Sequence, residues 1–198
     1  MARNKEFDPD VALQKALELF WERGYEATSM ADLVEHLGVA RASLYATFGG
    51  KRELYLRALE RYLAQRDVVE PLAQPGPALP AIRAFLDAYV AECLADELRR
   101  GCMVVNTAVE FAARDAAVSA KVTASWAELE TAFAAALVRA RAQGEIPAEK
   151  DPHALARFLL VLLQGVRVLG RADPDPRRRL CDAVDQAMNV IHIQERLV

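Results

Sequence analysis

The chain has 198 residues, a hydrophobic content of 53% and a formal net charge of -3. This hydrophobic fraction is ample for a packed core, so a disordered chain is excluded. The acidic balance excludes nucleic-acid binding over the whole surface, because phosphate contacts need clustered Lys and Arg. The first ten residues lack the apolar stretch of a secretory signal, and no run reaches about 18 uninterrupted apolar residues. We therefore expect a cytoplasmic protein with no membrane partner.

Apolar residues recur at helical spacing in nearly every segment longer than ten residues, and no sustained alternation indicates strands. This pattern predicts an all-α protein. The first helix has the order Asp8-Pro9, a cap followed by proline, and ends at Gly24. Thr28 or Ser29 can cap the second helix. The helices expected in this half occupy about residues 9–23, 29–37, 40–48 and 51–67.

A proline-rich stretch divides the chain. Residues 70–80 hold four prolines and a glycine, so they cannot continue a helix and mark the best domain boundary. The predicted parts are a domain of three helices at residues 1–50, a connector helix at 51–69, a linker at 70–80 and a second helical domain at 81–198. Helices are expected in that last part at about 80–98, 102–114, 116–142, 152–172 and 175–193.

Residues 28–48 have the pattern of a helix-turn-helix, two short helices joined by a glycine-containing turn, which places its second helix in the DNA major groove. Arg41 can bind guanine or phosphate, and hydroxyl groups can bind bases or phosphates. Amide groups at a helix start and a nearby lysine suit phosphate. The candidate DNA-binding residues are Thr28, Ser29, Arg41, Ala42, Ser43, Tyr45, Thr47 and Lys51. The alternative is an ordinary helical hairpin.

Residues 8–64 resemble the tetracycline-repressor (TetR) family. The matching positions are Gly38, Val39, Ser43, Leu44, Tyr45, Phe48, Lys51 and Leu54. The resemblance implies that Tyr45 and Lys51 hold phosphates while the first turn of the third helix reads bases. Ala40 departs from the family pattern, since a capping Ser or Thr is common there, and the missing cap costs on the order of 1 kcal/mol.

Two C-terminal helices carry enough apolar surface to suggest a subunit interface. Residues 153–169 are apolar around almost the whole helix, and the last helix has one apolar stripe. The family resemblance implies that both helices pair with their symmetry mates in a four-helix dimer bundle. The interface residues predicted on this basis are Leu159, Leu163, Val166, Leu180, Val184, Ala187, Met188 and Ile191. The alternative is an ordinary monomeric core.

In similar proteins the helices between these two regions enclose an inducer pocket. The candidate ligand-binding residues here are Phe85, Tyr89, Met103, Asn106, Phe111, Trp126, Leu129, Phe133 and Phe158. Aromatic residues at helical spacing also occur as plain core. Asn106 is a polar amide in an apolar segment, so it either satisfies a backbone group or faces a ligand.

Cys102 is a candidate redox sensor. It follows Arg99 and Arg100 and opens a helix, two influences that favour a thiolate. Its segment resembles a subgroup of the family with Gly-Cys followed by Asn and Glu, some of whose members respond to electrophiles or oxidants. The alternative is a small buried thiol of little reactivity. Cys93 and Cys181 are expected to be structural.

Together these features predict a ligand-responsive transcriptional regulator, a repressor by family resemblance. It would bind palindromic double-stranded operator DNA as a homodimer and be released by an unknown small molecule or by thiol modification. One alternative is an architectural DNA-binding protein without ligand control. A cysteine-dependent enzyme is the other, but His36, His153 and His192 have no recognisable relation to a cysteine or acid. We expect no enzymatic activity, no cofactor and no metal, because no metal-ligand spacing occurs.

Overall fold

The computed structural model describes residues 7–192, which contain helices and no strand. This confirms the predicted all-α class. Clustering of contacts divides the chain into two compact units, each built from two separate stretches of sequence. Unit 1 holds residues up to Arg66 together with 102–122, and unit 2 holds residues 67–101 together with those from Thr123 onward.

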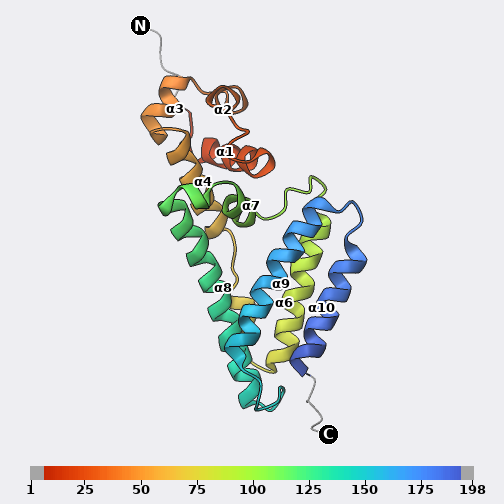
Figure 1. Cartoon of the computed structure of the whole chain (residues 1–198). Coiled ribbons are helices and arrows are strands. Elements are labelled where there is room, and N and C mark those ends of the chain that lie inside the picture. The colour runs from red at the N-terminus through yellow and green to blue at the C-terminus, as the bar shows by residue number, and fades with distance from the viewer. Residues whose placement is uncertain (1–6, 193–198) are drawn as a thin grey trace. The chain divides into compact units, whose positions relative to one another are not determined.

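Unit 1 contains the helices expected for the DNA-binding domain and a segment from the second half of the chain. Its helices are α1 (Pro9–Arg23), α2 (Met30–Leu37), α3 (Arg41–Phe48), α4 (Lys51–Ala64), α7 (Met103–Glu110), the short 3-10 helix η1 (Ala112–Arg114) and the start of α8 (Ala116–Ala142). In this unit α1 packs against α2 and α4, and α4 also contacts α7 (Figure 1).

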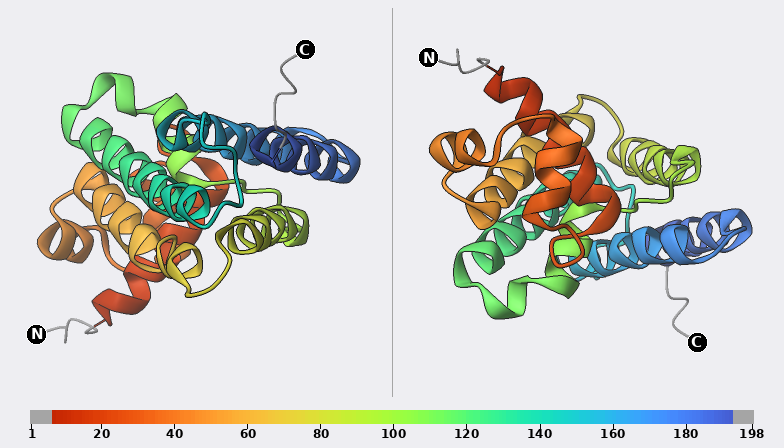
Figure 2. Two further views of the ribbon diagram at one scale, coloured as in Figure 1. Left: turned by 90° about the horizontal axis from the view of Figure 1, so that it is seen from below. Right: turned by 90° about the horizontal axis from the view of Figure 1, so that it is seen from above.

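Unit 2 is a bundle of longer helices. It contains α5 (Glu70–Ala73), α6 (Ala78–Ala95), the remainder of α8, α9 (Pro152–Ala172) and α10 (Arg177–His192). The three helices α6, α9 and α10 lie side by side (Figures 1 and 2). Their shared core consists mainly of Leu, Val and Ala side chains. Burial of this apolar surface is the main force that holds the bundle together.

Local capping explains where the helices of unit 1 begin and end. The Asp8 carboxylate accepts a hydrogen bond of 2.8 Å from the Asp10 amide, and Pro9 occupies the first turn. Ser29 and Asp32 form a reciprocal capping box at the start of α2. Gly38 ends α2 in the left-handed conformation. Ala40 makes no side-chain cap at the start of α3, as expected from its methyl group.

The domain boundaries differ from the prediction in two ways. Residues 102–122 belong to unit 1, so residues 81–198 do not form one continuous domain. The reason is that Thr107 and Phe111 have their partners in α1–α4, contacts that periodicity does not reveal. The predicted linker also contains α5, which tolerates Pro71 because proline suits the first turn of a helix.

Helix α9 is long and apolar enough to cross a membrane when judged by length and composition alone. One such helix is weak evidence, since the core helix of a bundle passes the same test. Its Leu159, Leu163 and Val166 side chains are buried and belong to the core shared with α6 and α10. The apolar character of α9 is therefore accounted for in part by the bundle.

Candidate functional site

The second helix of the predicted helix-turn-helix is anchored on one side and open on the other. Leu44 and Phe48 are buried and fix α3 to unit 1. Arg41, Ala42 and Tyr45 are exposed. The Arg41 guanidinium lies 5.8 Å from the centre of the Tyr45 ring, so the cation and the phenol share one face of α3. This face can bind both base edges and phosphates.

Two other predicted residues of α3, Ser43 and Thr47, are half-buried. Arg57 of α4, which the sequence reasoning missed, is exposed and donates a hydrogen bond of 3.3 Å to the Thr47 carbonyl oxygen. Its guanidinium also lies 5.6 Å from the centre of the Phe48 ring. The sequence feature that could have pointed to Arg57 is its position six residues after Lys51 on the same predicted helix. Its contact with α3 follows from the packing of α4 against α3.

Thr28 is incorrectly predicted as a phosphate ligand. Its side chain is fully buried, and its hydroxyl donates a hydrogen bond of 2.7 Å to the Gly24 carbonyl oxygen. Ser29 is exposed, but its hydroxyl and amide both donate to the Asp32 carboxylate. These bonds hold the pKa of Asp32 below its ordinary value, so the start of α2 already carries an anion.

Lys51 begins α4 and is half-buried. Its ammonium group lies 4.2 Å from the centre of the Tyr25 ring, in the turn between α1 and α2. The Tyr25 ring is stacked on Phe111, with ring centres 4.2 Å apart and planes inclined by 7°. Lys51 is therefore held beside an aromatic platform that includes a residue from the second half of the chain.

Cys102 lies in a buried polar group rather than on the surface. Its side chain is 4% exposed, and its sulfur accepts hydrogen bonds of 3.6 Å from the Tyr62 hydroxyl and from Arg66. Arg66 also donates to the Tyr62 oxygen at 2.8 Å. The sequence pattern pointed to Arg99 and Arg100 and not to Arg66, because a contact between the segment that follows α4 and the start of α7 has no local signal. Cys93 is buried, and burial raises the pKa of its thiol, whereas Cys181 is exposed.

The nine candidate ligand-binding residues fall into both units. Met103, Asn106 and Phe111 belong to unit 1, where Phe111 stacks on Tyr25. The remaining six belong to unit 2: Phe85, Tyr89, Trp126, Leu129, Phe133 and Phe158.

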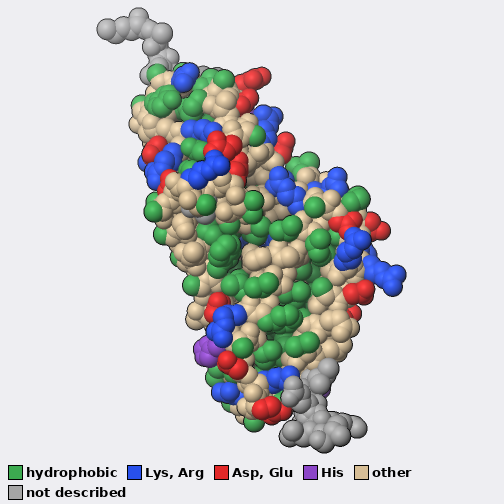
Figure 3. Space-filling model, in the orientation of Figure 1, with side chains coloured by type: hydrophobic (Ala, Val, Ile, Leu, Met, Phe, Trp, Pro, Cys, Tyr) green, Lys and Arg blue, Asp and Glu red, His purple; other side chains and the backbone are tan. Residues whose placement is uncertain are grey.

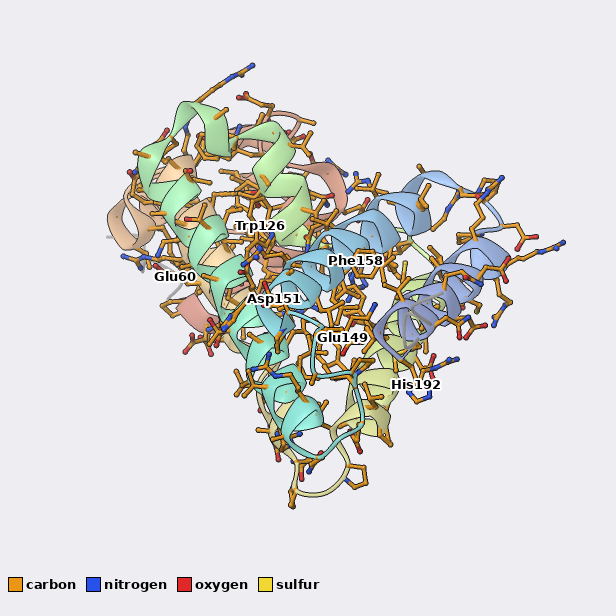
Figure 4. The ribbon with its side chains drawn as sticks, turned by 60° about the horizontal axis from the view of Figure 1, so that its bottom comes forward. Glu60, Trp126, Glu149, Asp151, Phe158 and His192 are labelled. Atoms are coloured by element: carbon orange, nitrogen blue, oxygen red, sulfur yellow. The ribbon has the colours of Figure 1, made fainter. Side chains whose placement is uncertain are left out.

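Within unit 2, only part of the aromatic set comes together. Phe85 packs edge-on against Phe133, with ring centres 5.3 Å apart, and lies next to Tyr89. Phe158 is 40% exposed on α9 (Figure 4). The buried indole nitrogen of Trp126 on α8 has no hydrogen-bond partner among residues 7–192. These side chains offer an apolar environment with one unsatisfied donor.

A buried cation, Arg167, also lies in unit 2 and was missed by the sequence reasoning. Its side chain is 3% exposed, its guanidinium lies 3.9 Å from the centre of the Tyr89 ring, and it pairs with Glu92 at 2.6 Å. The pair links α9 to α6. A sequence signal existed in Arg167, the one charged side chain in the apolar run 158–170 of α9, because a buried charge has to find a partner.

The choice of dimer-interface residues was wrong. Seven of the eight are buried within the core of their own unit, and Met188 is half-buried. They stabilise the bundle because the apolar stripe of α10 faces α6 and α9. The exposed apolar side chains of α9 are a different set: Phe158, Val161, Val168 and Leu169.

The anchored α2, the left-handed glycine turn and the exposed polar face of α3 define a helix-turn-helix DNA-binding protein. Residues 12–58 match the family model of bacterial regulatory proteins of the tetR family, and residues 78–191 match a tetracyclin repressor-like C-terminal domain. The chain belongs to the TetR family of transcriptional regulators.

Individual relatives agree with this assignment. The chain is 39% identical over 194 residues to the uncharacterized HTH-type transcriptional regulator YezE of Bacillus subtilis, covering 96% of this chain and 100% of that protein. It is 34% identical over 173 residues to the HTH-type transcriptional repressor ComR of Escherichia coli, covering 85% and 82%. A cysteine mutant of the TetR family regulator CifR, in complex with a 26 bp double-strand operator DNA, has a TM-score of 0.82 at 36% identity, covering 94% of this chain and 98% of that chain.

Proposed function

We propose that this regulator is a cytoplasmic repressor that binds palindromic double-stranded operator DNA as a homodimer and leaves it when a small molecule binds or a thiol is modified. The observation that carries the proposal is the face of α3, where Arg41, Ala42 and Tyr45 are exposed on a helix anchored by Leu44 and Phe48. The repressor ComR and the operator complex of CifR support it.

The residues of this face have separate tasks. Arg41, Ala42, Ser43 and Thr47 contact base edges, which specify sequence, while Tyr45 and Lys51 contact phosphates, which position the protein. One copy of this small face provides few cations, so a single unit binds weakly. Two copies in a dimer read both halves of a palindrome, at a spacing near 34–36 Å, one turn of DNA.

The exposed stripe of α9 is the proposed dimer surface. Phe158, Val161, Val168 and Leu169 recur at helical spacing around the exposed Gly165. Hydrophobic side chains gather over this region of the surface (Figure 3). A two-fold axis across α9 would bury the same stripe on both subunits, which is how symmetric dimers form.

We place the small-molecule site among the aromatic residues of unit 2, around Phe85, Tyr89 and Phe133, where apolar and aromatic side chains suit a ligand of low polarity. Cys102 is the proposed site of thiol modification. An adduct on its sulfur cannot fit between Tyr62 and Arg66 without moving α4. Exchange of Cys102 for serine should abolish release by electrophiles, and unchanged release would show that the thiol has no sensing role.

Selection of duplexes from a random library by the purified protein tests the DNA-binding proposal. We expect one palindromic consensus, bound at low nanomolar to tens of nanomolar concentration, on the order of 10³-fold tighter than random DNA. Arg41→Ala should weaken binding and relax specificity at one base pair. Arg178→Ala, which removes an exposed arginine of unit 2, is the matched control and should bind normally.

Weak binding without sequence preference would contradict the proposal and support the architectural alternative. Size-exclusion chromatography with light scattering tests the dimer. Val161→Glu places a charge in the centre of the α9 stripe and should produce folded monomers with reduced operator affinity. A wild-type monomer at micromolar concentration would overturn the dimer.

A further inference from the structure

The last residue of α7, Glu110, holds the turn between α1 and α2. Its two carboxylate oxygens accept hydrogen bonds from the backbone amides of Tyr25, at 2.9 Å, and Glu26, at 2.7 Å. The partners are 85 and 84 residues apart in sequence. Hydrogen bonds from amides to a charged acceptor are stronger than those between neutral groups. Glu110 therefore fixes the backbone of this turn from outside the helix-turn-helix.

The backbone conformation of Gly24 and its lack of a side chain allow this contact. Its φ of +89° lies in the region that disfavours side chains, and a Cβ at this position would lie only 2.7 Å from a Glu110 oxygen. The turn therefore needs glycine both for its backbone conformation and for the approach of the carboxylate. Such a fit indicates a specific contact rather than a chance encounter between surface groups.

The residue that Glu110 holds also supports Lys51. The Tyr25 ring has Phe111, the neighbour of Glu110, stacked on one face. Because that face is occupied at 4.2 Å, the Lys51 ammonium, also 4.2 Å from the ring centre, lies over the other. Glu110 fixes the backbone of Tyr25, and the ring of Tyr25 fixes the direction of Lys51.

We propose that Glu110 is a positioning residue for DNA binding, acting through Tyr25 on the phosphate contact of Lys51. The proposal rests on the proposed function, in which Lys51 binds a phosphate. In this proposal a carboxylate of α7 contributes to DNA binding, although the DNA-binding helices of unit 1 all lie within the first 66 residues. Glu110 itself is kept from DNA by its negative charge, and its carboxylate accepts hydrogen bonds from two backbone amides.

The negative charge of Glu110 lets a binding measurement distinguish positioning of the turn from simple repulsion between the carboxylate and DNA phosphates. Removal of a carboxylate from a DNA-binding unit reduces repulsion of phosphates and should strengthen binding. A positioning carboxylate has the opposite effect. Glu26→Ala is the matched control, because it removes a carboxylate from the same turn while its backbone amide still donates to Glu110.

The test is a double-mutant cycle with the full chain and the selected operator duplex, measured by fluorescence anisotropy over a range of salt concentrations. We expect Glu110→Ala and Lys51→Ala each to raise the Kd about tenfold and to reduce the salt slope by about 1.8, because a homodimer loses two phosphate contacts, each of which contributes about 0.9 on B-DNA. The double variant should bind within about twofold of either single variant, because both changes remove the same contact. Glu26→Ala should bind as tightly as wild type or more tightly.

Glu110→Gln provides a second variant that keeps the shape of the side chain. Its oxygen still accepts one amide, so we expect a Kd between those of wild type and Glu110→Ala, with a melting temperature close to wild type. The proposal is overturned if Glu110→Ala or Glu110→Gln, verified as folded by circular dichroism, binds the operator as tightly as wild type. It is also overturned if Glu110→Ala leaves the salt slope unchanged, or if the double variant raises the Kd by the product of the two single effects. Failure of the wild-type protein to prefer any duplex would instead overturn the proposed function.

Discussion

The two units of this molecule are stabilised in different ways. Unit 2 is held mainly by aliphatic side chains of α6, α9 and α10, to which ion pairs between its helices add, such as Arg167 with Glu92 and Arg83 with Asp185. In unit 1, polar contacts join segments far apart in the chain, such as the Tyr55 hydroxyl with Thr107 and the Arg52 guanidinium with the Asp115 carboxylate. Apolar packing tolerates small adjustments, whereas hydrogen bonds specify one arrangement. A surface that reads DNA has to hold its side chains in one arrangement, and hydrogen bonds specify that arrangement more narrowly than apolar packing does.

The largest effect is expected from the core of unit 2. Leu163→Ala removes a fully buried side chain of α9 and should lower the free energy of unfolding by about 3 kcal/mol, since the transfer term and the cavity add. His153→Ala, at an exposed position of the same helix outside the proposed dimer stripe, is the control and should change the free energy of unfolding by less than about 0.5 kcal/mol. Urea denaturation of both variants at the same dimer concentration measures the difference. Equal costs would show that α9 does not divide into a buried and an exposed face.

A smaller effect is expected from the polar core of unit 1. Tyr55→Phe removes the hydroxyl that bonds to Thr107 at 2.7 Å and should cost about 1 to 1.5 kcal/mol. Burial raises the pKa of Tyr55 to about 12, so the hydroxyl keeps its proton at both pH 7 and pH 9. Denaturation at pH 7 and pH 9 should therefore give the same cost. A cost near zero would mean that this bond does not hold α7 to α4.

The ion pair between Arg52 and Asp115 should make the free energy of unfolding of unit 1 depend on pH in the acidic range. The hydrogen bonds from Arg52 hold the pKa of Asp115 below its ordinary value. A lowered pKa in the folded state contributes stability that is present above about pH 4 and is lost as the pH falls through the folded value. Asp115→Asn should unfold with a shallower dependence on pH below about 4. An acid titration followed by circular dichroism measures it, and an unchanged slope would contradict the contribution of this pair.

The smallest effect is a gain at the start of α3. Ala40 precedes this helix without a side-chain cap, and its extended backbone suits a capping residue. Ala40→Ser should stabilise the protein by about 0.5 to 1 kcal/mol, because its hydroxyl can accept an amide of the first turn. The wild-type Ala40, which lacks the hydroxyl, is the reference. Thermal unfolding compares the two proteins, and a melting temperature of Ala40→Ser no higher than that of wild type would remove the capping explanation.

Sequence patterns predicted the limits of the helices well, but they did not predict which helix faces pack against one another. The predicted limits 116–142 and 152–172 agree with α8 and α9, since caps and prolines act locally. The inner face of α9 was not predictable, because a helix that is apolar on nearly all sides gives no sign of which side is buried. The helix-turn-helix was recognisable from fixed spacing, yet Thr28 was assigned to DNA although its hydroxyl is used by Gly24.

Contacts of high sequence separation account for the remaining differences. Glu110 with the Tyr25 amide, Arg66 with Cys102, and Arg167 with Glu92 each join segments that are far apart in the chain. No period or motif connects such pairs. A charged residue in an apolar helix, as at Arg167, indicates that a partner exists but not where it lies.

Residues 102–115 belong structurally to unit 1 although they follow α6 in the chain. Hydrogen exchange of the Leu163→Ala variant tests it most directly, because the substitution loosens unit 2 alone. We predict that amides of α9 and α10 exchange faster than in wild type, while those of α7 keep their wild-type rates together with α1 and α4. Acceleration of the α7 amides in step with α9, with α1 and α4 unchanged, would contradict the claim.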